Sequence, residues 1–141
     1  MDDTREIKIA KLEDLWFALQ IAWDRDTAKG DWDSLIPSKN QCAVTALVIQ
    51  DYFGGKLLRC LMSNGDSHYW NLVGNIELDL TAQQFLYMKD YPIKSETVER
   101  DRDYVLSFPD TKCRYEILSR RVDKIIKNLY DEMEKIMRFK G

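Results

Sequence analysis

Hydrophobic residues spaced three and four positions apart mark the first predicted helix, over residues 11–24. Residues 25–38 are mostly polar and contain Gly30 and Pro37, so they are predicted to form a loop. The apolar positions of the helix are Leu12, Leu15, Trp16, Leu19, Ile21, Ala22 and Trp23.

A second helix is predicted over residues 41–53, where Val44, Leu47 and Val48 supply an apolar face and Gly54-Gly55 ends it. Two starts fit the residues before it. Ser38 and Gln41 have the spacing of a capping box, and Asn40 is an alternative cap.

Three short segments then read as an antiparallel meander, over residues 56–62, 67–73 and 76–80. Asn64-Gly65 and Gly74-Asn75 are the turns, because these residues tolerate positive φ. Thr81 is predicted to cap a short helix that runs to Tyr87. The charged residues 89–103, with Pro92, are predicted to be a surface connection or flap.

The chain ends in a long predicted helix over residues 111–138, capped by Asp110. Its apolar stripe fits packing on the domain's own core and also fits a partner helix. We expect the stripe to be buried through about Leu129 and its end to be left for a second subunit, giving a homodimer. That end comprises Met133, Ile136, Met137 and Phe139.

The 141 residues suit one α+β domain, with 45% hydrophobic and 32% charged residues. The net charge of −3 argues against a nucleic-acid partner. No signal peptide or membrane-spanning run is evident, so a cytoplasmic location is expected. Three cysteines and one histidine argue against disulfides and zinc, and no cofactor or metal is expected.

The candidate chemistry lies in the order of a cysteine, a histidine and a carboxylate. Cys42 stands at the start of the second helix, where free N–H groups favour a thiolate. His68 and Asp79 stand on two adjacent predicted strands. Converging side chains would give a nucleophile, a general base and a carboxylate that orients the imidazole.

Gln41 could donate its amide to an oxyanion, and Trp70, which alternates with His68, could wall the site. Asn71 is an alternative orienter, although strand alternation places it on the face opposite His68. The structural alternatives are a packed Cys42, a hydrogen-bonded His68 and an Asp79 that caps the next helix. Cys60 and Cys113 are predicted to have no catalytic role.

Four stretches together resemble the YunG-like family of small bacterial proteins: Asn40-Gln41-Cys42-Ala43-Val44-Thr45-Ala46, Gln50-Asp51-Tyr52-Phe53-Gly54-Gly55, Ser67-His68-Tyr69-Trp70-Asn71 and Asp79-Leu80-Thr81. Arg114-Tyr115-Glu116-Ile117-Leu118 resembles the family's C-terminal helix. The clear likeness spans about residues 35–120, and leaves out the first 30 residues and the helix beyond about Asp123. It implies a papain-like or NlpC-like core, with Cys42, His68 and Asp79 in the three catalytic roles.

These observations predict a thiol-dependent hydrolase of peptide or isopeptide amides that works through an acyl-enzyme. Acyl or glutamyl transfer by the same triad is an alternative, in which an amine replaces water. A non-enzymatic binding module on the same fold is another. The sequence does not name the substrate.

Overall fold

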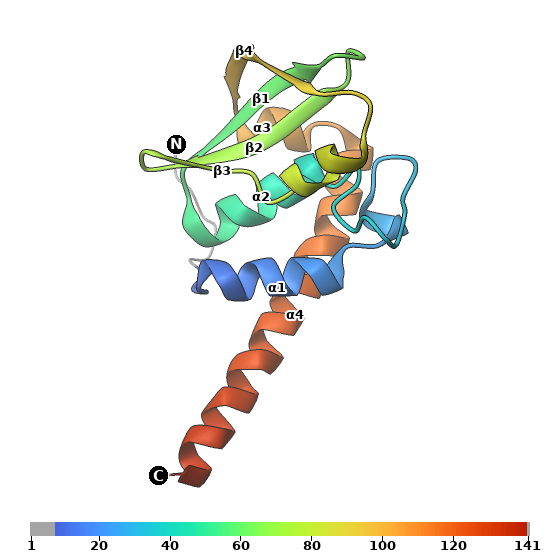
Figure 1. The fold of residues 1–141 in the computed structure, drawn as a ribbon. Helices are drawn as coiled ribbons and strands as arrows, with labels where there is room; N and C mark the ends of the chain where they lie inside the picture. Colours follow the sequence, from blue (N-terminus) through green and yellow to red (C-terminus); the bar gives the residue numbers. More distant parts are fainter. Residues whose placement is uncertain (1–7, 141) are drawn as a thin grey trace.

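The computed structural model describes residues 8–140 as a small antiparallel sheet with helices packed beside it, an α+β arrangement (Figure 1). The elements in chain order are α1 (Leu12–Ala22), the 3₁₀ turn η1 (Arg25–Thr27), α2 (Cys42–Phe53), β1 (Lys56–Met62), β2 (Ser67–Val73), β3 (Ile76–Leu78), the 3₁₀ turn η2 (Ala82–Tyr87), β4 (Pro92–Arg100), α3 (Arg102–Leu106) and α4 (Pro109–Lys140).

Within the described residues the sheet has the strand order β3-β2-β1-β4, with antiparallel neighbours throughout. The β1–β2 hairpin confirms the predicted turn at Asn64-Gly65, although only Gly65 has a positive φ, of 92°. Gly55 turns the chain from α2 into β1 with a φ of 77°, and a Cβ there would collide with the carbonyl oxygen of Leu72. This turn therefore needs glycine, and it lays α2 along the sheet.

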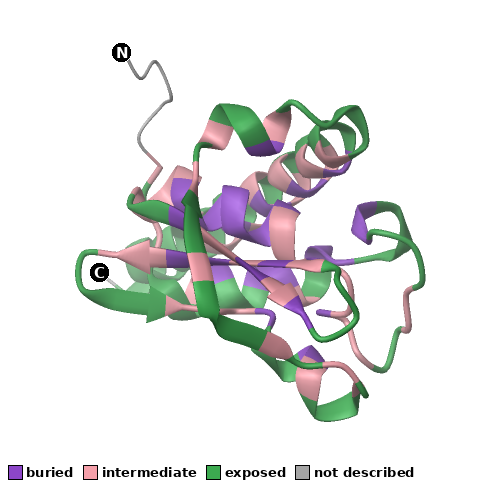
Figure 2. Ribbon diagram, turned by 90° about the horizontal axis from the view of Figure 1, so that it is seen from above, coloured by how far each residue is buried: buried purple, intermediate pink, exposed green. Residues whose placement is uncertain are grey.

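The main core lies where α1, α2 and α4 meet. Buried residues gather in the middle of the fold (Figure 2). The centre of the main core contains fully buried residues from all three helices, including Leu15, Val48 and Leu118. A second apolar cluster joins α2 to β1 and α3 through Leu47, Leu57 and Val105. Packing on both sides makes α2 the central helix and fixes where its first residue, Cys42, lies.

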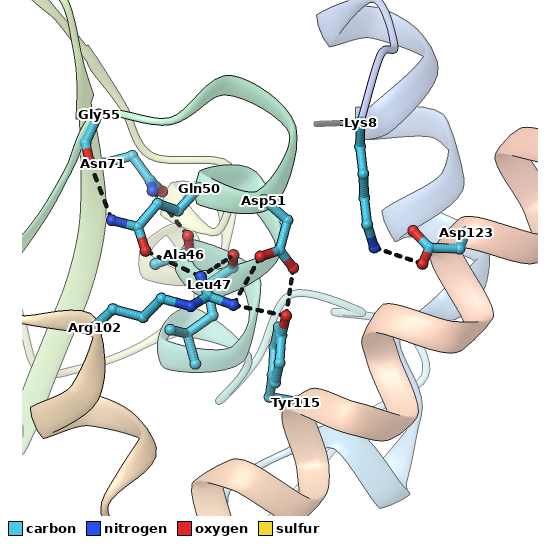
Figure 3. A network of polar contacts seen from close by, with 10 residues as sticks. All are labelled: Lys8, Ala46, Leu47, Gln50, Asp51, Gly55, Asn71, Arg102, Tyr115 and Asp123. Carbon is cyan, nitrogen blue, oxygen red and sulfur yellow. Dashed lines mark hydrogen bonds and ion pairs between the residues drawn. The ribbon is translucent and has the colours of Figure 1, made fainter. Parts of the chain in front are cut away.

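A buried polar network also holds α2 in place (Figure 3). Arg102, at the start of α3, pairs with Asp51 of α2 at 2.7 Å, and donates to the carbonyl oxygen of Leu47 and to Gln50 Oε1. Its second Nη atom donates to the hydroxyl of Tyr115 on α4 at 2.7 Å. One guanidinium thus joins three helices, α2, α3 and α4.

The predicted surface connection over residues 89–103 is wrong, because β4 occupies most of it and pairs with β1. Pro92 stands at the first position of this edge strand, where proline is tolerated. Because this edge strand is mostly exposed and carries charged side chains, it lacks the apolar pattern by which a strand is predicted from sequence. Charged side chains on an edge also discourage pairing with other chains. The short helix α3 was missed as well.

The predicted caps of α2 are also corrected. Gln41 occupies the N-cap position and its side chain makes no capping hydrogen bond. Asn40 instead adopts a φ of 61° and donates its amide to the carbonyl oxygen of Asp31 at 2.7 Å. Its backbone N–H donates to Gln84 Oε1 at 3.1 Å. Asn40 therefore holds the preceding loop against η2 and does not cap α2.

The remaining helix predictions divide. Trp16 of α1 is exposed rather than part of the core, because α1 buries only one face. On α4 the expected division is confirmed: Leu118, Val122 and Ile126 are buried, Leu129 is partly buried, and residues 131–140 are all exposed. The last turns of α4 extend beyond α1 and away from the rest of the fold (Figure 1).

Candidate functional site

Cys42 is the first residue of α2, as predicted, and its side chain is partly buried. The thiol lies 3.8 Å from the carbonyl oxygen of Ser67, the first residue of β2. The start of the central helix thus meets the start of a central strand. Because no side chain caps α2 at Gln41, the first backbone N–H groups of the helix have no capping acceptor there.

His68 lies on β2 next to Ser67 and is buried, with 1% of its surface exposed. Its Nε2 atom is 2.6 Å from Oδ2 of Asp79. Asp79 is not on the third strand as predicted, because β3 ends at Leu78 and Asp79 is the residue after it. Leaving the strand frees Asp79 from the alternation of the sheet and lets its carboxylate turn toward β2.

Asp79 is held in that orientation by Thr81. Its Oδ1 atom accepts from the backbone N–H of Thr81 at 3.3 Å and from its hydroxyl at 3.2 Å. One oxygen therefore fixes the turn and the other meets the imidazole. The sequence suggested that Thr81 capped the next helix, but its side chain makes no cap there.

The electrostatics of His68 reflect both neighbours. Burial lowers the pKa of the imidazole, but hydrogen bonding to Asp79 and to Cys42, together with negative charge on both groups, raises the pKa of His68 to about 9. Since Nε2 is engaged by Asp79, Nδ1 is the ring nitrogen left for the thiol. With its pKa raised in this way, the imidazole favours the protonated form at neutral pH.

Aromatic rings enclose the imidazole. Trp70 stacks on His68 with ring centroids 5.4 Å apart, and Phe85 of η2 meets it edge-on at 4.7 Å. Trp70 therefore packs against the imidazole, and its indole N–H donates to Glu77 Oε1 at 2.7 Å. The ammonium group of Lys94, on β4, lies over the Trp70 ring, 4.9 Å from its centroid. Together the rings restrict how the imidazole can move.

Two further predicted site residues make structural contacts. The Nε2 of Gln41 donates to the carbonyl oxygen of Asp24 at 3.0 Å, which commits one of its two amide hydrogens. Asn71 donates to the carbonyl oxygen of Ala46 at 2.9 Å and so ties β2 to the middle of α2. Asp79, rather than Asn71, makes the hydrogen bond to His68.

The other cysteines differ sharply from Cys42. Cys60 is fully buried, and burial raises the pKa of its thiol. Cys113 is exposed on α4. Across residues 8–140, no three histidine, cysteine or acidic side chains gather as metal ligands. No helix in the same part of the chain is long and apolar enough to cross a membrane.

Sequence reasoning missed four residues around the site: Ser67, Thr81 as the support of Asp79, Phe85 and Lys94. Thr81, two residues after Asp79, was the one with a readable signal, since aspartate often accepts from the backbone two positions on. Phe85 and Lys94 come from segments whose positions depend on long-range packing.

Comparison with known proteins places this chain in a family. A family model described as "YunG protein" matches residues 11–127, most of the chain. The chain belongs to the YunG family. The match begins within the first 30 residues, which the sequence comparison above had left outside, and it ends before the exposed end of α4.

The chain is also similar to "Uncharacterized protein YunG" of Bacillus subtilis (strain 168). The two are 32% identical over 92 residues, which cover 65% of this chain and 75% of the relative. No solved structure matches the chain. Membership of the YunG family therefore identifies relatives of this chain but not a reaction.

Proposed function

We propose that this protein is a thiol-dependent amide hydrolase in which Cys42 is the nucleophile, His68 the general base and Asp79 the group that orients the base. The observation that carries the proposal is the buried imidazole, held 2.6 Å from a carboxylate on one side and neighbouring a helix-start thiol on the other. A cysteine that has both an imidazole and a helix N-terminus has the two features that activate a thiol.

The reaction would proceed in two halves. In the proposed resting state His68 already holds the thiol proton, and the sulfur of Cys42 attacks the carbonyl carbon of a peptide or isopeptide amide. The uncapped N–H groups at the start of α2 would stabilise the oxyanion. The C–N bond then breaks, the leaving amine takes the proton from His68, and a thioester remains on Cys42. Water attacks this thioester and passes a proton to His68, and the acid is released with Cys42 as the thiolate beside the protonated His68.

The proposal includes a papain-like core, since a helix that begins with the nucleophile packs here on an antiparallel sheet that carries the base. Transfer to an amine acceptor would use the same first half, with the amine in place of water. We place the reaction in the cytoplasm, where a reducing environment would keep Cys42, Cys60 and Cys113 as free thiols.

The first test is site-resolved labelling. Limited treatment with iodoacetamide over a pH series, followed by peptide mass spectrometry, should label Cys42 faster than the other two cysteines. Exposed Cys113 is the internal control for access, and buried Cys60 should be protected until the protein unfolds. Labelling of Cys42 that is no faster than that of Cys113 at every pH would count against an activated nucleophile.

Two variants test the assignment of the third residue. Asp79→Asn should keep the fold and slow the labelling of Cys42 at acidic pH, because the imidazole loses its orienting partner. Asn71→Ala should change stability rather than the pH dependence of labelling, since its amide holds α2 to β2. The opposite pattern would transfer the orienting role to Asn71.

A second candidate function is protein association, supported by the end of α4. Every residue from 131 to 140 is exposed, including Met133, Ile136, Met137 and Phe139. The polar side of the same turns is already paired internally, through Lys127–Asp131, Lys135–Glu132 and Arg138–Glu134. An apolar stripe with a self-paired polar back suits a second copy of this chain, so we propose a homodimer through α4.

A further inference from the structure

One more charged feature lies beside the thiol. Arg59 of β1 stands directly opposite Tyr69 of β2, and its Nε donates to the hydroxyl of Ser67 at 3.1 Å. The carbonyl oxygen of the same Ser67 is 3.8 Å from the thiol of Cys42. Arg59 and Cys42 therefore meet at one residue, from two different elements.

Arg100 lies on the same face of the sheet. It stands opposite Leu57, while Arg59 stands opposite Val98, so the two arginines are diagonal neighbours on β1 and β4. The guanidinium of Arg100 lies 5.1 Å from the ring centroid of Tyr104 on α3. Its Nε atom is buried and has no hydrogen-bond partner in the described part of the chain.

Diagonal neighbours on one face of a sheet are within reach of each other's long side chains, so one anion could contact both guanidinium groups. Across residues 8–140, however, neither arginine forms an ion pair with an acidic side chain. Glu99, next to Arg100, pairs with Lys56 at 3.5 Å. Donor capacity at this face is thus left for a ligand.

Tyr69 marks how close these groups are to one another. Burial raises the pKa of its phenol, both arginines lower it, and Cys42 raises it further. Arg59, Arg100 and Cys42 therefore all lie near enough to Tyr69 to affect its pKa. The strand register and the contacts at Ser67 place the three residues in the same way.

We infer that Arg59 and Arg100 bind a carboxylate of the substrate beside Cys42, so that the amide which is cleaved carries an acidic group next to the scissile bond. That the bound carboxylate belongs to a substrate rests on the proposed function. That Arg59 and Arg100 bind a carboxylate does not depend on it. Guanidinium groups match carboxylates through paired N–H donors, and Arg59 and Arg100 present two such groups on one face. The carboxylate belongs either to an acidic side chain or to the end of a peptide.

Matched alkylating probes test the site on the intact protein. N-iodoacetyl-glutamic acid α-amide and N-iodoacetyl-glutamine α-amide differ only in the charge of the side chain. Peptide mass spectrometry gives the alkylation rate of the glutamic acid probe divided by that of the glutamine probe at each cysteine. This ratio should be about fivefold higher at Cys42 than at exposed Cys113. The preference should fall as salt is added, because partly exposed charges are screened.

The variants Arg59→Gln and Arg100→Gln should each lower this ratio, while Lys56→Gln on the same strand should leave it unchanged. Acid-over-amide ratios at Cys42 equal to those at Cys113 for both this pair of probes and the alanine pair below, or ratios insensitive to both arginine variants, overturn the inference. A second pair of probes, N-iodoacetyl-alanine and its amide, separates the sources: preference for the free acid in this pair alone would assign the site to a peptide terminus.

Failure of the proposed function has a different signature. If Cys42 reacts slowly with every probe, binding is measured instead by NMR titration with the α-amides of N-acetylglutamic acid and N-acetylglutamine. Selective shifts of the Arg59 and Arg100 Nε–H signals by the acid support the carboxylate site without any catalysis. Equal responses to the two compounds overturn it.

Discussion

The Nε2 atom of His68 lies 2.6 Å from Oδ2 of Asp79, and this contact joins β2 to the residue that follows β3. The other oxygen of Asp79 is fixed by Thr81. The imidazole is therefore oriented by a carboxylate that is itself held by the backbone. Such an arrangement leaves Nδ1 outside the contact with the carboxylate, and in the proposed function this nitrogen serves the thiol of Cys42.

The titration of His68 tests this arrangement directly, because the chain contains one histidine. Its ring protons should titrate with a pKa of about 9, well above the usual 6.5, in a proton NMR series. Asp79→Asn should lower that pKa, and Cys42→Ala should also lower it, since both partners favour the charged imidazole. A wild-type value at or below 6.5 would contradict the described contacts.

Stability should depend on pH through the same group. A histidine whose folded-state pKa is raised stabilises the protein fully below its unfolded value of 6.5, and this contribution is lost as pH rises through about 9. The free energy of unfolding should therefore fall over this window, by an amount on the order of 1–3 kcal/mol. Urea unfolding at successive pH values measures it. The Asp79→Asn variant, which lacks the carboxylate that raises the pKa of His68, should show a shallower decline.

The network at Arg102 makes a prediction about folding alone. Arg102→Met would leave Asp51, which is mostly buried, without its guanidinium partner and would uncouple α3 from α2 and α4. We expect a loss of about 3 kcal/mol in the free energy of unfolding, as for other broken buried pairs. Arg138→Met is the matched control, because its pair with Glu134 is exposed and should change stability by less than about 0.5 kcal/mol. If the two variants change the free energy of unfolding equally, the Arg102 network does not stabilise the fold as predicted.

The exposed end of α4 predicts self-association. Sedimentation of the intact chain should show a dimer that a chain ending at Tyr130 does not form, because residues 131–140 carry the unpacked apolar stripe. Met133→Lys together with Ile136→Lys should have the same effect without shortening the helix, whereas Lys127→Ala on the polar side should not. An intact protein that stays monomeric at high concentration would contradict the dimer.

Much of the site was predictable from sequence because its signals are local. A cysteine after a polar loop and before an apolar helical run identifies a helix start, and α2 does begin at Cys42. Asn64-Gly65 and Gly74-Asn75 set the turns, so the bounds of β1 and β2 agree with those predicted. The contact between His68 and Asp79 followed from placing them on adjacent strands, although Asp79 lies just past the end of its strand.

The sequence by itself determined the helices with apolar periodicity, the hairpin, the position of Cys42 and the stripe of α4, because each depends on residues within a few turns. Only the tertiary structure decided that residues 92–100 form β4, since an exposed edge strand is stabilised by its partner β1 rather than by its own apolar pattern. That long-range pairing also places Arg100 beside Arg59, and the packing of η2 against β2 brings Phe85 to His68. Contacts between segments so far apart depend on the whole fold, and no local pattern encodes them.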